Sequence, residues 1–306
     1  MRDWTCVMPD SNPRDAATRD RFDLTVVIPA HNEERHIAEQ LEALSLEVWP
    51  DGRWEVIVVD NRSTDRTVEI AEGFRDRLPS LRVVAATDGA GVSYAKNVGF
   101  QHARSDLVAT CDADDVVAAG WVVAMGAALQ QHRFVAGPLE VDRLNPKWLA
   151  DTRGRRVETG LLTFRDIFPI APAGNVGLHR SLWESLGGFS EDAAGAEDAD
   201  FSMRAWLAGE RLHFEPAAVL HYRYRGDARS LWRQGRGYGR GRVWVCRELK
   251  RRNLPTARLY GWRSWAWLIL HLPGLVSSSG RLAWLWVAAN RIGQLEGSVR
   301  FRTVYL

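Results

Sequence analysis

The sequence predicts an α/β fold in which a mostly parallel central sheet carries helices on both faces, followed by a helical C-terminal extension. Short β-branched apolar runs alternate with segments of helical spacing over residues 24–112, which is the pattern of βαβ units. From Gly226 onward the alternation is replaced by a chain rich in Arg, Gly and Trp. The 306 residues, 46% hydrophobic and 25% charged, suffice for a core without disulfides or a structural metal.

Each expected element follows from a local pattern. The run LTVVIP at 24–29 predicts a buried strand, and Ile37, Leu41 and Leu44 mark the apolar face of the helical segment after it. The further expected strands are 54–60, 81–86, 106–112, around 134–139, 211–216 and 217–223. The expected helices are 31–45, 63–77 with Ser63 or Thr64 as N-cap, 92–103, 119–131, near 181–186 and about 197–208.

Three regions are predicted along the chain: a flexible tail over residues 1–22, a folded α/β domain over 23–225, and a helical extension over 226–306. The N-terminus lacks the apolar stretch of a secretory signal. The three cysteines are widely spaced and form neither a disulfide framework nor a CxxC zinc pattern. These features predict a reducing, cytoplasmic location.

Positive charge is concentrated in the C-terminal part. Residues 201–306 carry 19 Lys and Arg against 5 Asp and Glu, although the net charge of the whole chain is only +2. This excess predicts an anionic ligand or surface; nucleic acid is disfavoured because no binding module is recognisable. We expect the glycine- and arginine-rich residues 223–242 to close over a phosphate group as a mobile loop.

The apolar stretch 264–289 is interrupted by Pro273 and Arg281. Each uninterrupted piece is about half of the roughly 20 residues that a spanning helix needs, so the stretch predicts two short helices. Four placements stay open for them: the anionic inner face of the plasma membrane, a helical hairpin that dips into the bilayer, packing on the α/β domain, or packing on a second subunit in a homodimer.

Acidic and amide side chains follow three strands of the predicted sheet. The first strand runs into PAHNE (29–33), the second ends at Asp60, and the fourth ends in CDADD (111–115). Open α/β folds bind ligands beyond the carboxyl ends of their strands. The D-x-D pair Asp112 and Asp114 offers hard oxygen ligands, which favour Mg²⁺ or Mn²⁺ beside a diphosphate. Neither G-x-G-x-x-G nor a P-loop motif is present, which disfavours those nucleotide-binding classes.

Four further residues have two interpretations each. Lys96 is either a phosphate contact or a solvated helix lysine. Glu197 and Asp198 either stabilise a helix N-terminus or supply a general base. His221, at the end of an expected strand just before the arginine-rich segment, is either a ligand or an ordinary packed histidine.

In this order the motifs resemble those of family 2 glycosyltransferases with the A-type nucleotide-sugar-binding fold, over residues 24–224. The resemblance implies that residues 23–225 form a catalytic domain. Processive members of the family often carry Gln-x-x-Arg-Trp, whereas residues 232–242 lack the Arg-Trp pair, so we do not expect synthesis of a long polymer. The segments that carry the resemblance are VVIPAHNEE (26–34), VIVVDNRSTDRT (56–67), AKNVGF (95–100), CDADD (111–115), AGN (173–175), LGGFSE (186–191), EDADFSMR (197–204) and LHYR (220–223).

The resemblance also implies roles for individual residues. Asp198 would be the base that deprotonates the acceptor hydroxyl, with Glu197 beside it. Asp114 would ligate Mn²⁺ or Mg²⁺, with His221 as a further ligand. The donor would be held by Pro29, Ala30, Asn32, Glu33, Asp60 and Asp112, with the basic Lys96 and Arg223 as our candidates for its phosphates, while Gly174 and Asn175 would lie near sugar and acceptor.

The expected activity is metal-dependent transfer of a sugar from a UDP- or GDP-type donor to an acceptor hydroxyl, with a lipid-linked or cell-envelope glycan among the open acceptors. A single base allows one in-line displacement, which inverts the anomeric centre. Two alternatives stay open. A nucleotidyltransferase would use a similar acidic metal site, and a non-catalytic sugar- or lipid-binding protein could use the same scaffold.

Overall fold

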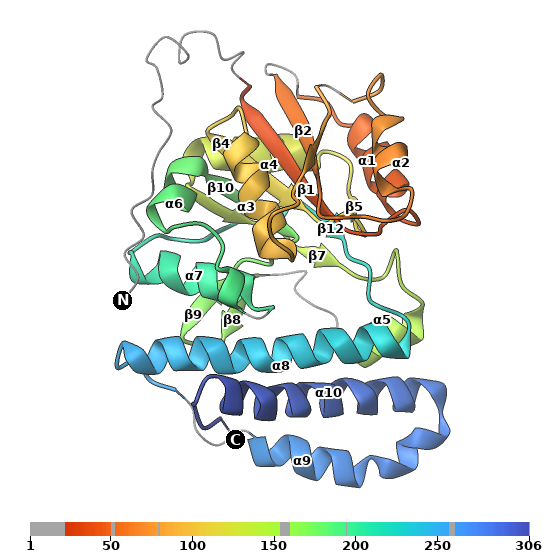
Figure 1. The fold of residues 1–306 in the computed structure, drawn as a ribbon, viewed down its shortest axis with the longest axis vertical. Helices are drawn as coiled ribbons and strands as arrows, with labels where there is room; N and C mark the ends of the chain where they lie inside the picture. The colour runs from red at the N-terminus through yellow and green to blue at the C-terminus, as the bar shows by residue number, and fades with distance from the viewer. Residues whose placement is uncertain are drawn as a thin grey trace.

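A computed structural model describes residues 22–49, 53–78, 80–153, 160–193, 195–256 and 261–305 of the chain. An α/β domain lies above a layer of long C-terminal helices (Figure 1). The flexible tail predicted for residues 1–22 lies outside the described residues, apart from Phe22, which is buried.

A mixed, mostly parallel sheet forms the centre of the α/β domain. Its described strands follow the order β11-β6-β10-β4-β1-β2-β3. Only β10 pairs antiparallel with its neighbours, β4 and β6, so the predicted fold class is confirmed. The strands are β1 (Leu24–Ala30), β2 (Trp54–Asp60), β3 (Arg82–Ala85), β4 (Leu107–Cys111), β6 (Phe134–Ala136), β10 (Asn175–His179) and β11 (His213–Phe214).

Helices cover both faces of this sheet, because alternate residues of each strand point to opposite sides. Val26 of β1 packs in one apolar cluster with α1, α2 and α4, whereas Val27 packs in another with α3, α6 and α7. The helices are α1 (Ile37–Ser45), α2 (Thr67–Glu72), α3 (Val92–His102), α4 (Trp121–Gln131), α6 (Arg180–Ser185) and α7 (Glu197–Leu207).

Smaller elements complete the α/β domain, and several were not expected from the sequence. The single strand expected around 134–139 is divided between β6 and β7, which pair in different sheets. A hairpin of β8 and β9 and the short helix α5 occupy the segment without a clear sequence pattern. These elements are β5 (Val116–Val117), β7 (Leu139–Glu140), α5 (Lys147–Arg153), β8 (Leu162–Phe164), β9 (Phe168–Ile170), η1 (Glu191–Ala193) and β12 (Leu220–His221).

The predicted helix start at Ser63 or Thr64 is wrong. Helix α2 begins at Thr67, and Arg66 occupies the N-cap position without a side-chain cap. Ser63 Oγ instead accepts a hydrogen bond from the backbone N–H of Asn32, and Asn32 Oδ1 accepts one from the N–H of Thr64. These hydrogen bonds join the loop after β1 to the loop after β2. The helical spacing of residues 63–77 gives no sign of this contact between loops, so it predicts too early a helix start.

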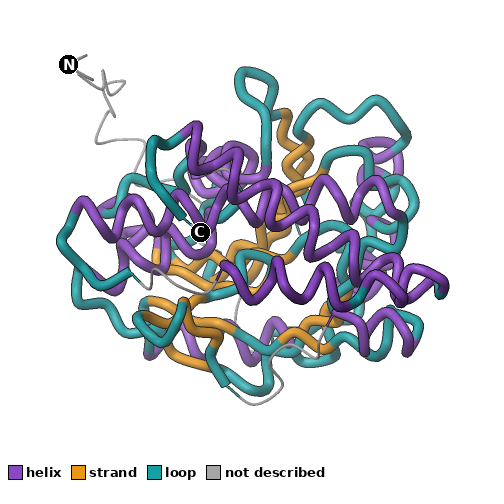
Figure 2. Tube along the Cα trace, turned by 90° about the horizontal axis from the view of Figure 1, so that it is seen from below, coloured by secondary structure: helices purple, strands orange, loops and turns teal. Residues whose placement is uncertain are grey.

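The C-terminal extension consists of α8 (Ala228–Arg251), α9 (Gly261–Leu270), η2 (Leu272–Val276) and α10 (Ser278–Arg300). Helices α8 and α10 lie side by side, and α9 lies against α10 on the side away from the sheet (Figure 1). Figure 2, viewed from below, shows these helices crossing in front of the strands. Among the described residues, no helix combines the length and apolarity needed to cross a bilayer.

The expected mobile loop over 223–242 is wrong from residue 228 onward, because α8 is one continuous helix there. Its glycines serve close helix packing. A Cβ on Gly235 would lie 2.8 Å from Ala289 Cβ of α10, and one on Gly241 would lie 2.5 Å from Ala196 Cβ, beside the start of α7. Glycine therefore lets the backbone of α8 approach both α10 and the α/β domain.

Candidate active site

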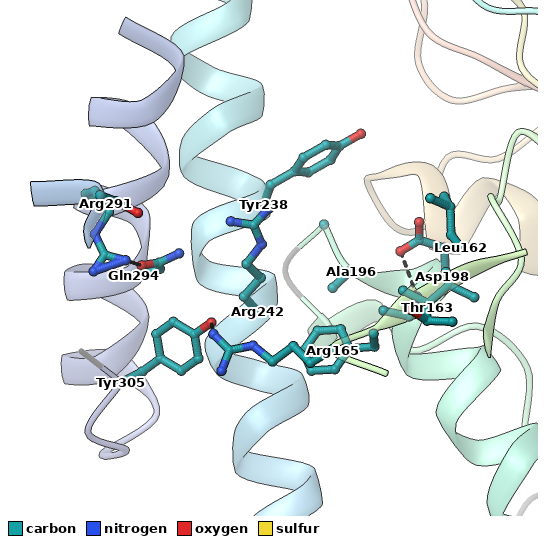
Figure 3. A pocket seen from close by; sticks show the side chains of 15 residues that line it. Leu162, Thr163, Arg165, Ala196, Asp198, Tyr238, Arg242, Arg291, Gln294 and Tyr305 are labelled. Carbon is teal, nitrogen blue, oxygen red and sulfur yellow. Dashed lines mark hydrogen bonds between the residues drawn. The ribbon is translucent and has the colours of Figure 1, made fainter. Parts of the chain in front are cut away.

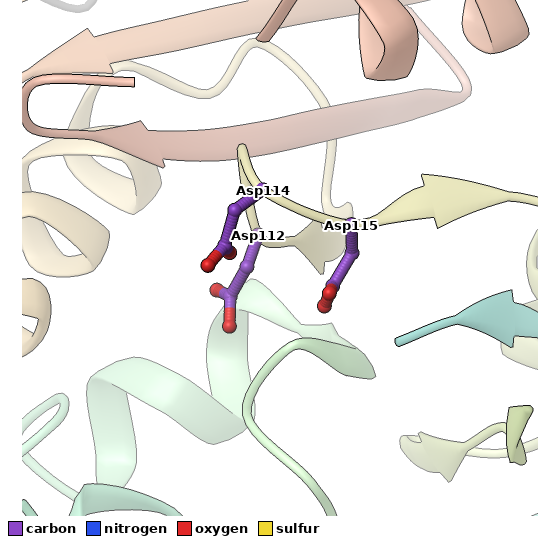
Figure 4. Close-up of side chains that lie close together, drawn as sticks. All are labelled: Asp112, Asp114 and Asp115. Atoms are coloured by element: carbon purple, nitrogen blue, oxygen red, sulfur yellow. The ribbon is translucent and has the colours of Figure 1, made fainter. Parts of the chain in front are cut away.

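Three carboxylates gather directly after β4, where the sequence places CDADD. Ligand oxygens of Asp112, Asp114 and Asp115 lie within 4.8 Å of one another. In Figure 4 the three side chains point the same way from the segment between β4 and β5. Three such groups repel one another unless a cation or protons neutralise them.

The burial of Asp114 and Asp115 raises the pKa values of their carboxyl groups. Asp115 is 1% exposed, and its Oδ1 accepts the backbone N–H of Arg223 at 2.8 Å. Its Oδ2 is buried and has no hydrogen-bond partner in the described structure. Burial and the two neighbouring carboxylates raise the pKa of Asp115 well above its ordinary value. Burial likewise raises the pKa of Asp114 to about 6, with Arg225 acting in the opposite direction.

These observations fit a divalent cation. Three carboxylates converge, and two of their buried oxygens, Asp112 Oδ1 and Asp115 Oδ2, have no hydrogen-bond partner in the described structure. Carboxylate oxygens are the ligands that Mg²⁺ and Mn²⁺ prefer. Asp112, Asp114 and Asp115 are therefore the residues that could hold the metal.

Lys96 is not a solvated lysine. Its side chain on α3 is completely buried, and Nζ donates a 2.7 Å hydrogen bond to the carbonyl of Ala173. The same Nζ lies 3.3 Å from Asp112 Oδ1. A buried ammonium is costly without such partners, so Lys96 supplies a positive charge behind the acidic group.

Two arginines approach the acidic group from the segment after β12. Arg225 Nη2 lies 3.0 Å from Asp114 Oδ2, and its Nη1 lies 3.8 Å from Glu33 Oε1. Arg223, the expected phosphate contact, donates from Nε to the carbonyl of Asp114 and from Nη2 to Glu39. The guanidinium that pairs with a side-chain carboxylate of the acidic group is therefore that of Arg225 and not that of Arg223.

His221, the expected further metal ligand, is engaged elsewhere. Its Nδ1 lies 2.6 Å from Glu140 Oε2, and its Nε2 lies 3.0 Å from Arg143 Nη1. It does not belong to the cluster of metal-competent groups among the described residues. A role on the metal would require His221 to exchange these contacts, and it remains a prediction.

The expected nucleoside-binding residues lie at the ends of β1 and β2. Pro29 and Ala30 are buried in β1, and Asn32 is exposed in the loop that follows. Asp60 Oδ1 accepts the backbone N–H of Ser63 at 3.2 Å. Glu33 contacts Arg225, which connects this edge of the sheet to the acidic group.

Gly174 and Asn175 have different surroundings. A Cβ on Gly174 would lie 2.7 Å from Asp112 Oδ2, so only glycine lets the backbone approach the acidic group this closely. Asn175 has no exposed surface; its Nδ2 donates to the carbonyls of Pro138 and Ala218, and its Oδ1 accepts from Trp121. The side chain of Asn175 is therefore bonded within the protein, and the expected place of Asn175 near sugar and acceptor stays a prediction.

Glu197 and Asp198 begin helix α7. Burial raises the pKa of Glu197 to about 7, and Asp198 contributes, whereas Lys96 lowers it. Asp112 also acts on the pKa of Glu197, which places the start of α7 and the acidic group in one electrostatic environment. Asp198 Oδ1 accepts the N–H of Ala199 at 2.7 Å, so the helix end orients this carboxylate.

Asp198 also lines a cavity of about 460 Å³ between the α/β domain and the C-terminal helices. Figure 3 shows Asp198 on one side of this space and residues of α8 and α10 on the other. Its polar lining beyond Asp198 is mainly basic and aromatic: Arg165, Tyr238, Arg242, Arg291, Gln294 and Tyr305.

Sequence reasoning missed three kinds of residue here. Asp115 was one of three noted carboxylates but had no individual role, although its position next to D-x-D was a signal. Arg225 was one of many arginines in the basic segment. Arg165 lies in the hairpin between β8 and β9, and nothing in its local sequence indicates that it reaches Tyr305 and lines the same cavity as Asp198.

Two protein-family models match this sequence over the segments that contain these motifs. The profile of glycosyl transferase family 2 matches residues 25–186, and that of glycosyl transferase family group 2 matches residues 107–293. The first match spans the acidic edge of the sheet and more than half of the chain. The chain belongs to glycosyl transferase family 2. The fold and family that the sequence predicted are therefore confirmed.

The chain spans about half or less of the length of two curated relatives that it matches. The chain is 31% identical to the probable glycosyltransferase YdaM of Bacillus subtilis over 238 residues, which cover 72% of this chain and 56% of YdaM. It is 27% identical to the poly(ribitol-phosphate) beta-N-acetylglucosaminyltransferase TarS of Staphylococcus aureus, over 65% of this chain and 35% of TarS.

Two solved structures of other glycosyltransferases share the fold of this chain. Residues 1–349 of S. aureus TarS in complex with UDP-GlcNAc match with a TM-score of 0.55 at 20% identity, covering 92% of this chain and 93% of that one. The mannosyltransferase PcManGT of Pyrobaculum calidifontis, in complex with GDP-Man and Mn²⁺, matches with a TM-score of 0.59 at 21% identity, covering 90% and 87%.

Proposed function

We propose that this protein is a metal-dependent, inverting glycosyltransferase that moves a sugar from a nucleotide-diphosphate donor to an acceptor hydroxyl. The observation that carries the proposal is the group of three carboxylates after β4, flanked by Lys96 and Arg225 and electrostatically linked to Glu197. In this proposal residues 23–225 are the catalytic unit, and residues 226–306 complete it. Family membership favours glycosyl transfer over nucleotidyl transfer or simple sugar binding.

The donor follows from the charge of the site. Asp112, Asp114 and Asp115 would hold Mn²⁺ or Mg²⁺, which would neutralise the diphosphate and its developing charge as a Lewis acid. Arg225 and Lys96 supply fixed positive charge beside those carboxylates. The nucleoside would lie along the ends of β1 and β2, near Asp60. UDP- and GDP-sugars are both candidates, since one protein of similar fold binds UDP-GlcNAc and another binds GDP-Man together with Mn²⁺.

The chemistry requires one base and a stabilised leaving group. The acceptor oxygen forms a bond to the anomeric carbon, its proton passes to Asp198, and the electron pair of the broken C1–O bond leaves with the diphosphate. Asp198 suits the base because the N-terminus of α7 orients its carboxylate at the rim of the cavity. Glu197, with a pKa of about 7, is partly protonated at neutral pH and can donate a hydrogen bond. A single displacement inverts the anomeric configuration.

A donor screen tests this function directly. The full chain is incubated with UDP- and GDP-sugars and Mn²⁺, and released nucleoside diphosphate is measured with and without candidate hydroxyl acceptors. Asp198→Asn should lower transfer at least 100-fold, a typical contribution of a general base. Asp192→Asn is the matched control, because Asp192 is an exposed acid on the adjacent η1. Equal transfer by wild type and Asp198→Asn, or a product of retained configuration, would refute the assignment.

A second proposal concerns location: the C-terminal extension contacts the cytoplasmic face of the membrane. Large apolar side chains are exposed together on α9 and η2, with Ile269 at 69%, Leu270 at 74% and Val276 at 89% exposure. Arg263 and Arg281 are exposed on α9 and α10 beside them, as interfacial helices on anionic lipid require.

Vesicle flotation tests this location. The triple variant Ile269→Ser, Leu270→Ser and Val276→Ser should lose flotation with anionic vesicles. The control Leu46→Ser and Val48→Ser removes equally exposed apolar groups, at 74% and 71%, from the α/β domain and should float as wild type does. Equal flotation of the triple variant and wild type would eliminate the membrane contact.

A further inference from the structure

Helix α8 of the C-terminal extension contacts α7 on either side of the proposed base, Asp198 (Figure 1). Before the base, Gly241 approaches Ala196 so closely that a Cβ on the glycine would lie 2.5 Å from Ala196 Cβ. After the base, Trp244 Nε1 donates a 3.0 Å hydrogen bond to Asp200 Oδ1. Gly241 and Trp244 are three residues apart, so they share one face of α8. The first turn of α7 is therefore held between two contacts with the same helix.

The indole ring of Trp244 is held in place by residues of the C-terminal extension itself. The guanidinium of Arg247 lies over the ring, 4.0 Å from the ring centroid. The ring of Phe301 meets the indole nearly edge-on, at a centroid distance of 5.4 Å. Arg247 is bonded in turn to the carboxylate of Glu248. The direction in which the Nε1–H of Trp244 points is therefore set within the extension.

Asp200, the acceptor of this bond, is a buried carboxylate with a donor on each oxygen. It is 3% exposed, and its Oδ2 accepts a 2.8 Å hydrogen bond from Nε of Arg204. Arg204 also donates to the carbonyls of Leu186 and Gly188, which joins α7 to the turn after α6. A buried carboxylate oxygen that loses its donor is costly. Removal of the indole N–H should therefore shift Asp200 and the helical turn that carries it.

Apolar packing holds the two helices together but does not fix their rotation. Ala199 and Met203 of α7 pack in one buried cluster with Val243 of α8. Such contacts are non-directional, whereas a hydrogen bond requires its donor to point at its acceptor. Side chains two residues apart on a helix point about 200° apart. The bond at Asp200 therefore fixes the rotation of α7, and with it the direction in which Asp198 meets the cavity.

We propose that Trp244 is a positioning residue for the base: through Asp200 it holds the first turn of α7 in the rotation that presents the Asp198 carboxylate to the acceptor hydroxyl. The proposal rests on the proposed function, because that function assigns the role of base to Asp198. A misplacement of about 1 Å can cost on the order of 100-fold in rate. One hydrogen bond at this place can therefore have a large effect on turnover.

Two tryptophan substitutions separate this role from ordinary packing. Trp244→Phe removes the indole N–H and keeps an aromatic ring beside Phe301. The matched control is Trp284→Phe, because Trp284 is also half-buried in the extension and its Nε1 donates a 2.9 Å hydrogen bond to the carbonyl of Leu268 on α9. We expect Trp244→Phe to lower kcat for sugar transfer at least tenfold with the KM of the donor unchanged. Trp284→Phe should leave both values within twofold of wild type.

Hydrogen exchange of the full chain measures the same contact without turnover. The backbone amides of residues 200–203 should exchange at least fivefold faster in Trp244→Phe than in wild type, and at the wild-type rate in Trp284→Phe. A second pair of variants perturbs the other contact and keeps the test decisive if Trp244→Phe fails to fold. Gly241→Ala should also lower kcat and speed this exchange, whereas Gly237→Ala, whose Cβ would meet nothing within 4 Å, should do neither.

Several results would overturn the positioning role. One is an equal loss of turnover in Trp244→Phe and Trp284→Phe, which would indicate a general effect of a weakened extension. Unchanged exchange in α7, faster exchange at unchanged kcat, or a raised donor KM at unchanged kcat would each have the same consequence. If the wild-type chain neither transfers sugar nor hydrolyses a donor, the proposed function fails, while hydrogen exchange still decides whether Trp244 holds α7 in place.

Discussion

The contact between α8 and α10 can be tested with two alanine substitutions on one helix. A Cβ on Gly239 would lie 2.9 Å from both Gln294 N and Gly293 C of α10, and closer still to Asn290 O. A Cβ on Gly237, half a turn away, would meet nothing within 4 Å. A Gly→Ala substitution therefore gains the same helix propensity at both positions, but it causes a steric clash with α10 only at Gly239.

The magnitude follows from two opposing effects. Alanine stabilises a helix interior by about 1 kcal/mol relative to glycine, so Gly237→Ala should raise the free energy of unfolding by about 0.5–1 kcal/mol. At Gly239 carbon contacts need roughly 3.5 Å or more, so α10 must move by well over half an ångström. Such overpacking costs about 1–3 kcal/mol. Gly239→Ala should therefore be less stable than Gly237→Ala by about 1–3 kcal/mol.

Urea unfolding of wild type and both variants, followed by circular dichroism, measures this difference. If Gly239→Ala is as stable as Gly237→Ala, the two helices do not approach as closely as described, and the glycines serve another purpose. The result bears on function, because Arg242 and Arg291 enter the cavity from this helix pair.

Three further outcomes concern the acidic site. Asp115→Asn should weaken Mn²⁺ binding at least tenfold by calorimetry, because it removes charge from a buried oxygen that lacks a partner; unchanged affinity would argue against the cluster as metal site. Folding raises the pKa of Glu197 from about 4.3 to about 7, so ionised Glu197 destabilises the folded chain above pH 7 and has no such effect below the unfolded pKa. Glu197→Gln should therefore raise the unfolding free energy by about 3–4 kcal/mol at pH 8 and have little effect at pH 4, and the opposite order in urea unfolding would refute this cause. Lys96→Met should raise the pKa of Glu197 further, since Lys96 lowers it, and an NMR titration measures the change.

The strands and helices that carry the site could be predicted from the sequence, because each depends on residues close to one another along the chain. The apolar run LTVVIP and the helical spacing of Ile37, Leu41 and Leu44 are local patterns, and they correspond to β1 and α1. Parallel pairing then brings Ala30 opposite Asp60, and β4 ends beside β1. The acidic strand ends were therefore expected at one edge before the tertiary structure was known.

Contacts between distant segments decided the rest. His221 pairs with Glu140 and Lys96 with Asp112 and Ala173, although nothing local to either residue indicates its partner. The glycines of α8 are compatible with a mobile loop until α10 is seen packed against them. Arg165, Arg242 and Arg291 line the same cavity as Asp198 only because the hairpin and two helices converge there. Helix and strand propensities depend on short stretches of sequence, so they can be predicted without the tertiary structure. The burial of a charged side chain and its neutralisation depend instead on which distant side chains folding brings within a few ångströms of it.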